Sequence, residues 1–218
     1  WKIVIKYLMV KISVLIVTRN AEKHILSCLK SIINQFPDNN GWELIIVDGM
    51  SKDKTRKIVE DYLKDKGVEY RVVDNPRFTL ATGWNLGVSV AKGDYVVRPD
   101  AHAELLDNYI LNGVAHLDKE PELVAVGGIL ITKSENLIGE VIAAVLSNPV
   151  GIGYSLFRVG VSKDTYTDTA VYAVYRKPVF SQVGGLNESL TRNQDIDFHR
   201  RILDDGHKIM TAADMKAV

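Results

Sequence analysis

The chain has 218 residues, of which 46% are hydrophobic and 25% are charged, and these proportions exclude a disordered protein. Its 27 basic and 27 acidic residues balance, so nothing in the overall charge attracts nucleic acid, and we expect no nucleic-acid partner. The single cysteine, Cys28, excludes an internal disulfide framework and is typical of a reducing compartment; its apolar neighbours predict a packing role. No apolar run approaches the roughly 20 residues that span a bilayer.

The first half of the chain alternates between two apolar patterns. Short, continuous apolar runs predict buried strands at residues 11–17, 42–47, 68–73 and 94–98. Apolar residues at helical spacing predict helices at residues 21–36, 55–66 and 80–91. Strands that alternate with helices of this length indicate βαβ units, and therefore an α/β fold with a mostly parallel central sheet flanked by helices.

The second half is less regular. We predict a helix at 105–117, a strand at 123–131, a helix with a mobile loop within 132–167, a strand at 169–175 and a helix at 195–203. No repeat or linker divides the chain, so we expect one domain over 1–218. The chain begins with Trp1 and stops at Val218 within an apolar run, so we expect a fragment truncated at its C-terminus. Residues 1–10 fit either an extra strand or a segment added to the domain.

Polar residues gather where three of the predicted strands end. They occupy residues 18–20, 48–55 and 99–102. Ligands of open α/β sheets bind beyond the carboxyl ends of the strands, so this pattern predicts a nucleotide site. The chain has no phosphate-binding loop of the G-x-x-x-x-G-K-[ST] type, no G-x-G-x-x-G after the first strand and no G-x-S-x-G motif. Kinases, classical dehydrogenases and serine hydrolases are therefore disfavoured.

Three groups of motifs occur in an order that resembles glycosyltransferase family 2. They are Val17-Thr18-Arg19-Asn20 with residues 47–55, then Asn85-Leu86-Gly87 with residues 91–95, and finally residues 184–188 with residues 193–197. The similarity runs from about residue 11 to the end and is nearest to the succinoglycan-type exopolysaccharide transferases. It implies a GT-A, Rossmann-like fold. It also implies that Thr18, Asn20 and Asp48 line a nucleoside pocket.

Asp48, Asp53 and Thr55, at and after the second strand, could have structural roles instead of binding a ligand. The Asp48 carboxylate can accept a hydrogen bond from uracil N3–H, but an aspartate before a glycine is also a common turn residue. Asp53 and Thr55 stand at a natural helix start, so we expect them to cap that helix rather than to bind a ligand.

The triplet Asp100-Ala101-His102 stands where the family has its D-x-D motif. The resemblance assigns Asp100 to the ribose or to a metal and His102 to direct metal ligation. The expected cofactor is Mn²⁺ or Mg²⁺. Imidazole is a poor ligand for Mg²⁺ and an acceptable one for Mn²⁺. The same D-x-H variation occurs in the polypeptide N-acetylgalactosaminyltransferases. The alternative is a loop aspartate beside an ordinary surface histidine.

The resemblance also implies a general base, for which Asp195 is the candidate. A carboxyl group with an ordinary pKa of about 3.9 is ionised at neutral pH and can accept a proton. Asp197 is the rival, but an offset of two residues points it away on a helix, where we expect it to pair with Arg201. The alternative for Asp195 is stabilisation of the first helical turn. Trp84 stands where the family often carries a basic residue, which argues against a diphosphate contact there.

The implied function is that of an inverting glycosyltransferase. It would move a sugar from a UDP-sugar to a hydroxyl of a glycan or lipid-linked acceptor, in the cytoplasm and at the inner face of the cell membrane. Any membrane association would come from segments outside this chain. One alternative is a metal-dependent sugar nucleotidyltransferase, which would normally have a glycine-rich loop in place of residues 18–20. The other is a degenerate nucleotide- or glycan-binding module, against which Asp100 and Asp195 count.

Overall fold

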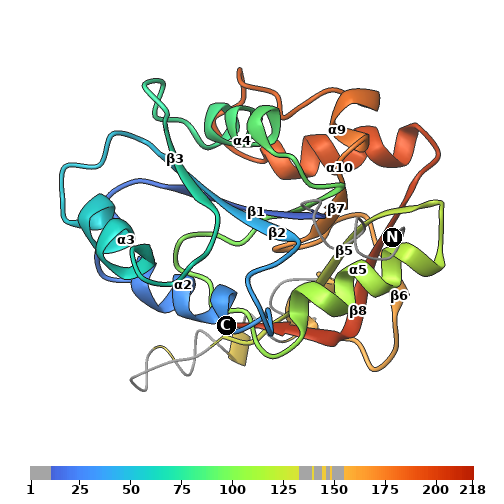
Figure 1. Ribbon diagram of the computed structural model, residues 1–218. Helices are drawn as coiled ribbons and strands as arrows, with labels where there is room; N and C mark the ends of the chain where they lie inside the picture. Colours follow the sequence, from blue (N-terminus) through green and yellow to red (C-terminus); the bar gives the residue numbers. More distant parts are fainter. Residues whose placement is uncertain (1–10, 133–138, 140–143, 146–147, 149–154) are drawn as a thin grey trace, which may run out of the picture.

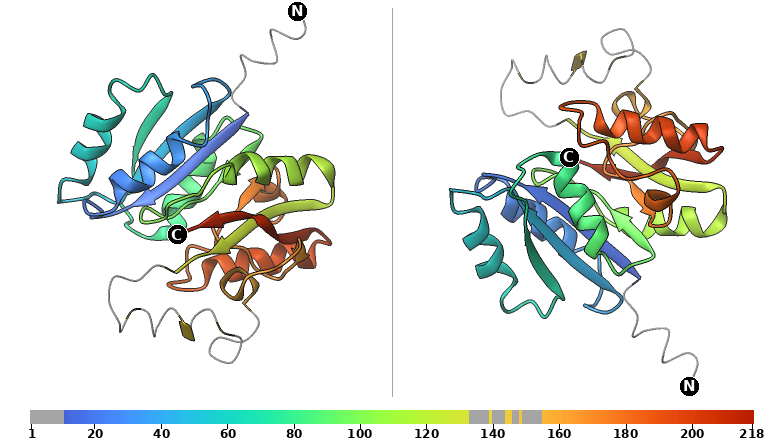
Figure 2. Two further views of the ribbon diagram at one scale, coloured as in Figure 1. Left: turned by 90° about the horizontal axis from the view of Figure 1, so that it is seen from below. Right: turned by 90° about the horizontal axis from the view of Figure 1, so that it is seen from above.

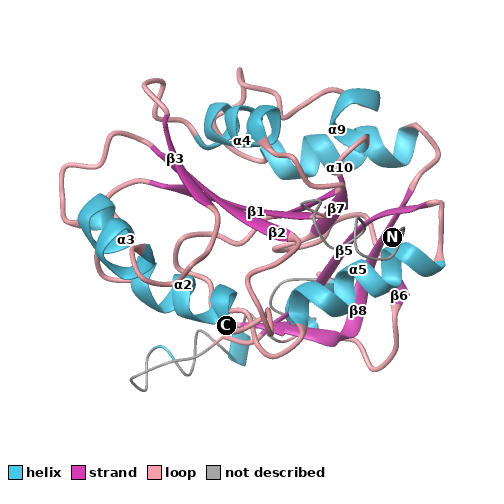
Figure 3. Ribbon diagram, viewed as in Figure 1, coloured by secondary structure: helices cyan, strands magenta, loops and turns pink. Residues whose placement is uncertain are grey.

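The computed structural model describes residues 11–132, 139, 144–145, 148 and 155–218. Within these residues eight strands form one sheet in the order β3-β2-β1-β4-β7-β5-β8-β6, with helices on both faces (Figures 1 and 3). The predicted α/β class, with a mostly parallel central sheet between helices, is confirmed. The prediction for residues 1–10 lies outside the described residues, and so does the prediction for half of the residues within 132–167.

The first four strands of the chain are parallel neighbours. They are β1 (Ile12–Thr18), β2 (Trp42–Asp48), β3 (Tyr70–Asp74) and β4 (Tyr95–Val97). Residues of β1 and β2 are buried almost throughout because helices cover both faces, which explains their continuous apolar sequence. Thr18 is in register with Asp48, so the polar residues that follow these strands emerge at the same edge of the sheet.

Two helical layers enclose the sheet. On one face lie α2 (Ile25–Ile33), α3 (Thr55–Leu63) and α5 (Tyr109–Lys119); on the other lie α4 (Leu80–Val90), α9 (Val179–Gln182) and α10 (Gln194–Asp204). The view from below in Figure 2 places α2 and α5 in front of the sheet, and the view from above places α4 and α10 there. In the described part of the chain, no helix is long and apolar enough to cross a membrane.

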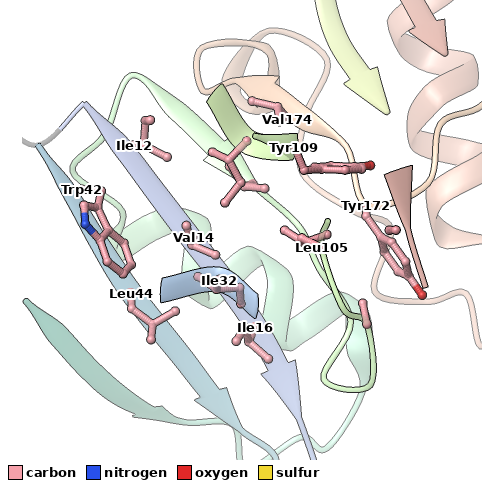
Figure 4. Packing of buried hydrophobic residues seen from close by; sticks show 14 of the residues in the cluster. Ile12, Val14, Ile16, Ile32, Trp42, Leu44, Leu105, Tyr109, Tyr172 and Val174 are labelled. Carbon is pink, nitrogen blue, oxygen red and sulfur yellow. The ribbon is translucent and has the colours of Figure 1, made fainter. Parts of the chain in front are cut away.

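Alternate residues of β1 belong to two separate hydrophobic cores. Ile12, Val14 and Ile16 pack with α2 and with β2 on one face (Figure 4). Leu15 points to the opposite face and belongs to the core beneath α4. A Cβ at Gly87 of α4 would lie 2.1 Å from Leu15 Cδ1, so this helix approaches the strand closely only because residue 87 is a glycine. The glycine of the Asn-x-Gly motif therefore has a packing role.

The second half departs from the sequence prediction at the strand expected at 169–175. The strand expected at 169–175 is reduced to β7 (Val174–Arg176), since Tyr172 has a φ of 46° and breaks the extended backbone. Residues 170–171 instead cross β5 (Leu123–Leu130) so closely that a Cβ at Gly127 would lie 2.6 Å from the Val171 carbonyl oxygen.

Further elements were missed or misplaced by the sequence pattern. The long strand β8 (Lys208–Ala217) and the short helix α9 were not predicted, and β8 pairs with β5 and with β6 (Thr165–Tyr166). Helix α5 starts at Tyr109, later than expected, because Leu105 forms a bridge with Ala217 of β8. The four-residue helix α8 (Leu156–Val159) lies within the region expected to hold a helix and a loop.

A fully buried histidine joins α10 to the antiparallel part of the sheet. His199 Nε2 lies 2.8 Å from the Tyr175 hydroxyl, and Nδ1 lies 3.1 Å from the Thr169 hydroxyl. Burial, followed by the positive charge of Arg98, lowers the pKa of His199 to about 4. The imidazole is therefore neutral at pH 7, with one nitrogen as donor and the other as acceptor.

This buried histidine predicts a pH dependence of stability. In the unfolded chain it takes up a proton near pH 6.5, whereas in the folded chain it does so near pH 4. Between these values the unfolded state binds more protons, so the free energy of unfolding should fall by up to about 3 kcal/mol as the pH drops through this window. Urea unfolding from pH 7 to 4.5 measures the slope, and His199→Gln should flatten it. Equal slopes in the two proteins would contradict the assignment.

Candidate active site

A cavity of about 400 Å³ opens at the carboxyl ends of β1 and β4, and we call it the β1–β4 cavity. Four of the six predicted site residues line it: Thr18, Asn20, Asp100 and His102. A volume of this order suits a small-molecule ligand. The sheet therefore brings together residues that are up to 84 positions apart, as the polar strand ends predicted.

Thr18, a residue of the cavity lining, has an unsatisfied polar atom. It is the last residue of β1 and is 4% exposed. Its hydroxyl oxygen is buried and has no hydrogen-bond partner. A buried hydroxyl without a partner is costly, so this geometry suits a bound polar ligand that would complete it.

Asn20 holds the loop after β1 against the loop after β2. Its backbone N–H donates to the Ser51 hydroxyl at 2.9 Å, and its side-chain oxygen accepts from Lys52 N–H at 2.9 Å. The residue has a φ of 51°, a left-handed conformation that asparagine tolerates better than most residues. This clamp uses the side-chain oxygen and does not involve the amide NH₂ group.

Asp48 lies beside the β1–β4 cavity and is absent from its lining. Its side chain is 4% exposed, and its carboxylate accepts hydrogen bonds from the Ser51 backbone N–H and hydroxyl, the latter at 2.5 Å. Arg56 Nε lies 3.6 Å from the same carboxylate. The turn-forming alternative for Asp48 is thus present in the structure, and its role in binding a nucleoside stays a prediction.

A second cavity, of about 250 Å³, lies on the other side of Asp100, and we call it the Arg98 cavity. Arg98, Asp100 and Asp195 are its charged lining residues, beside residues 169–172 and the apolar side chains of Phe157 and Ile196. Asp100 lines both cavities. The two cavities therefore adjoin at one carboxylate.

Asp195 stands in the first turn of α10, with its side chain 42% exposed. Oδ1 accepts a hydrogen bond from Ile196 N–H at 3.0 Å, as expected of a residue that stabilises a helix start. Oδ2 lies 3.9 Å from Arg98 Nη1. One carboxylate oxygen is thus engaged by the helix, while the other faces the guanidinium.

Asp197, the rival candidate for the base, is held in an ion pair outside both cavities. It forms the expected ion pair with Arg201 at 2.8 Å, which confirms that prediction, and it lines neither cavity. Arg201 also donates to the carbonyl oxygens of Gly184 and Gly185, so this pair fastens the loop before α10.

The neighbours of Asp100 are held neutral. Burial, followed by the negative charge of Asp100, raises the pKa of Cys28 to about 12 and that of Tyr172 to about 12. The Cys28 sulfur lies 3.4 Å from the Asp100 carbonyl oxygen and is fully buried, which confirms its packing role. Neither side chain supplies a nucleophile at neutral pH.

A carboxylate oxygen from Asp100 and an imidazole nitrogen from His102 make a donor set that suits Mn²⁺. In the described part of the chain, the group of three metal-type side chains that lie close together is elsewhere, at His116, Asp164 and Asp214. None of these three lines either cavity. A metal at Asp100 and His102 would therefore take its remaining ligands from bound oxygen atoms, as Mg²⁺ and Mn²⁺ do with phosphates.

Other motif residues are structural. The Asn85 side chain accepts from Leu186 N–H at 2.8 Å and donates to the Leu186 carbonyl oxygen at 2.9 Å, which ties α4 to the loop at 184–188. The expected capping of α3 is met only in part: the N-cap residue is Lys54, without a side-chain cap bond, while the Asp53 carboxylate accepts from the Thr55 N–H and hydroxyl at the helix start. The Thr55 hydroxyl and the Asp53 carboxylate also accept from the backbone N–H groups of residues 21 and 22.

Among the other residues that line the β1–β4 cavity are Arg19, which the sequence placed among the polar residues but to which it gave no role, and His24 and Leu80, which it missed. Arg19 follows Thr18 directly, and its guanidinium stacks on the exposed ring of Phe78 at 4.7 Å. The position of Arg19 between Thr18 and Asn20 was the sequence signal that could have identified it as a cavity residue. His24 and Leu80 start helices whose positions only the fold reveals.

A third cavity, of about 560 Å³, lies next to Gly93 and Asp94, before β4 begins. Lys92 and Lys177 line it, and both side chains are engaged, by Glu69 and by the Ala91 carbonyl oxygen respectively. It contains none of the predicted site residues and lies at the opposite end of the strand from Asp100.

Relatives of known name cover most of this chain. A dolichyl N-acetyl-α-D-glucosaminyl phosphate 3-β-D-2,3-diacetamido-2,3-dideoxy-β-D-glucuronosyltransferase of Methanococcus voltae is 28% identical over 206 residues, which are 92% of this chain and 64% of the relative. The succinoglycan biosynthesis protein ExoA of Rhizobium meliloti is 25% identical over 197 residues, 87% of this chain and 57% of the relative. The chain therefore spans about three fifths of the length of these relatives.

Solved structures show the same fold. The mannosyltransferase PcManGT of Pyrobaculum calidifontis, solved with GDP-Man and Mn²⁺, superposes with a TM-score of 0.73 at 21% identity over 95% of this chain and 56% of its own. TarS of Staphylococcus aureus, solved with UDP, gives a TM-score of 0.70 at 20% identity over 94% of this chain and 60% of its own. The expected GT-A fold is confirmed.

The family model of glycosyl transferase family 2 matches residues 13–184. This range contains the opening signature, the Asn-x-Gly motif and the Asp100-Ala101-His102 triplet. It favours a glycosyltransferase over the nucleotidyltransferase considered above. With its motifs in order, its fold matched and its cavities at the expected strand ends, the chain belongs to glycosyltransferase family 2.

Proposed function

We propose that this domain is an inverting glycosyltransferase that moves a sugar from a UDP-sugar to a hydroxyl of a glycan or lipid-linked saccharide in polysaccharide biosynthesis. The observation that carries the proposal is the position of Asp100 in the wall of two adjoining cavities. One cavity holds the predicted nucleotide and metal residues, and the other holds the predicted base. A donor and an acceptor bound in them would meet beside Asp100.

The β1–β4 cavity is the proposed donor site. Thr18, Asn20 and Asp100 line it, and Asp48 lies at its edge, in register with Thr18. The unpaired Thr18 hydroxyl supports a polar ligand there. The solved complexes of TarS with UDP and with UDP-GlcNAc, a protein of the same fold, support a uridine nucleotide.

Asp100 and His102 are the proposed ligands of Mn²⁺ or Mg²⁺. The complex of the Pyrobaculum mannosyltransferase with GDP-Man and Mn²⁺ supports a metal in this fold. When bound, the cation would neutralise the charge that develops on the leaving diphosphate. The imidazole of His102 favours Mn²⁺ over Mg²⁺.

The proposed reaction is a direct displacement. Asp195 Oδ2 accepts the proton of the acceptor hydroxyl as the hydroxyl oxygen bonds to the anomeric carbon. The bond between that carbon and the diphosphate oxygen breaks at the same time, and UDP leaves with the electron pair. Because attack comes from the side opposite the diphosphate, the anomeric configuration inverts. Asp195 and Asp100 line the Arg98 cavity together, which supports this division of roles.

The proposed acceptor is a lipid-linked saccharide or growing glycan at the inner face of the cell membrane. The name of the Methanococcus relative gives a dolichyl-linked N-acetylglucosaminyl phosphate as its acceptor, and ExoA is named for succinoglycan biosynthesis. The Arg98 cavity, with Phe157 and Ile196 in its lining, is the proposed place for that acceptor. Membrane association would depend on segments outside this chain.

The base assignment predicts a loss of turnover without loss of donor binding. A panel of UDP-, GDP-, dTDP- and CMP-sugars with Mn²⁺ first identifies the donor by release of the nucleotide. Asp195→Asn keeps the size of the side chain and removes its basic site, so turnover at saturating donor should fall by about 10²–10⁴-fold. UDP affinity, measured by calorimetry, should hardly change.

Asp197→Asn is the matched control on the same helix, and it should retain most of the activity because Asp197 lines neither cavity. Should Asp197→Asn be the inactive variant while Asp195→Asn turns over normally, the base has been assigned to the wrong carboxylate.

The metal assignment predicts that Mn²⁺ strengthens UDP binding more than Mg²⁺ does. His102→Ala should abolish this enhancement, because the imidazole is the ligand that distinguishes the two metals. Calorimetric titration of UDP with each metal and with EDTA measures it.

Asp214→Asn removes a carboxylate from the separate His116–Asp164–Asp214 group, which could also hold a metal, and should leave the enhancement intact. Full transfer in EDTA, with UDP affinity unaffected by metal, would refute the assignment.

A further inference from the structure

Arg98 is a buried cation whose donors are not all satisfied by the protein. It follows β4, and its backbone N–H donates to the Ala173 carbonyl oxygen, so its place in the sheet is fixed. Its side chain is 11% exposed. The Nε atom is buried and has no hydrogen-bond partner. A charge removed from water in this way needs a compensating partner, so its position calls for an explanation.

Trp84 lies against this guanidinium. The Arg98 Cζ atom lies 4.4 Å from the centre of the Trp84 ring, and Trp84 is 1% exposed within α4. A cation stacked on an aromatic face is attracted by the ring without using its N–H groups. The ring therefore stabilises the guanidinium without using its N–H groups.

Asp195 is the carboxylate that forms an ion pair with Arg98 in the described residues. The distance of 3.9 Å between Nη1 and Oδ2 is short enough for a strong charge attraction and too long for a hydrogen bond. Oδ1 is already occupied by the Ile196 N–H. The positive charge of Arg98 thus attracts Asp195 Oδ2 without a hydrogen bond, and the lone pairs of Oδ2 stay free to accept a proton.

We propose that Arg98, stacked on Trp84, is the positioning residue for the base: it directs Asp195 Oδ2 into the Arg98 cavity and offsets its charge beside Asp100. This inference rests on the proposed function, because it assigns a partner to the proposed base. Both carboxylates and Arg98 line the same cavity, with no other charged side chain among the lining residues described. Without the cation, two carboxylates and a bound diphosphate would repel one another, and Asp195 would turn outwards to solvent.

The test compares turnover with substrate affinity. In Arg98→Ala, kcat should fall by at least about tenfold, less than the loss expected when the base itself is removed. KM for donor and acceptor, and the affinity for UDP, should stay near the wild-type values. Arg98→Lys retains the positive charge but loses the planar guanidinium that lies over Trp84, so its kcat should lie between those of the wild type and Arg98→Ala. Arg200→Gln, an exposed arginine on the same helix as Asp195, should behave as the wild type.

Chemical rescue separates positioning from a purely structural role. Methylguanidinium, added below denaturing concentration, should restore part of the kcat of Arg98→Ala, whereas neutral methylurea should not. A normal kcat in Arg98→Ala would overturn the proposal, and so would a raised KM with unchanged kcat, which would mark Arg98 as a substrate ligand. Equal effects of the two additives would also overturn it. If the wild-type protein transfers no sugar from any donor, the proposed function itself fails, and this outcome is distinct from the others.

Discussion

The arrangement of the site depends on the pairing of one three-residue strand. β4 pairs in parallel with β1 on one side and antiparallel with β7 on the other, and its residues are almost fully buried. After Val97 the chain must leave the sheet, since Arg98 is the last residue tied to the β7 side, through its bond to Ala173. Residues 98–102 therefore project at the seam between the parallel and antiparallel parts of the sheet. The two cavities lie on either side of that projection.

This seam concentrates charge in a few side chains. Burial raises the pKa values of Tyr172 and Tyr175 to about 12 and lowers that of His199 to about 4, so all three side chains are neutral at pH 7. The charged side chains that remain in the Arg98 cavity are one guanidinium and two carboxylates. In a partly buried site such charges interact strongly, and their relative placement decides which carboxylate can act as a base.

The sequence predicted the parallel half of the fold well because local signals and tertiary structure agree there. The strands β1 and β2 are buried on both faces and read as unbroken apolar runs. The polar residues after them converge for a purely topological reason, so Thr18, Asn20, Asp100 and His102 could be placed together without coordinates. Asp48 could not be assigned in this way. The sequence is compatible with a nucleoside-binding role and with a turn-forming role, and the structure shows the hydrogen bonds of the turn to Ser51.

The antiparallel half could not be predicted in the same way. β8 is long but lacks regular alternation, because its register against β5 shifts between Gly127 and Ile129. The segment at 169–173 has the composition of a strand and is diverted by the left-handed Tyr172. The contact between Arg98 and Asp195 joins residues 97 positions apart, and the stack on Trp84 depends on how α4 lies over the sheet. No local pattern encodes either contact.

The central claim is that donor and metal bind at the β1–β4 cavity, beside Asp100. A crystal of the protein grown with UDP and Mn²⁺ allows the metal to be located by its anomalous scattering. We expect a single strong peak between Asp100 and His102, with the diphosphate of UDP completing the coordination of the metal and the uridine beside Thr18. A peak only at His116, Asp164 and Asp214, or UDP bound in the cavity lined by Lys92 and Lys177, would contradict it.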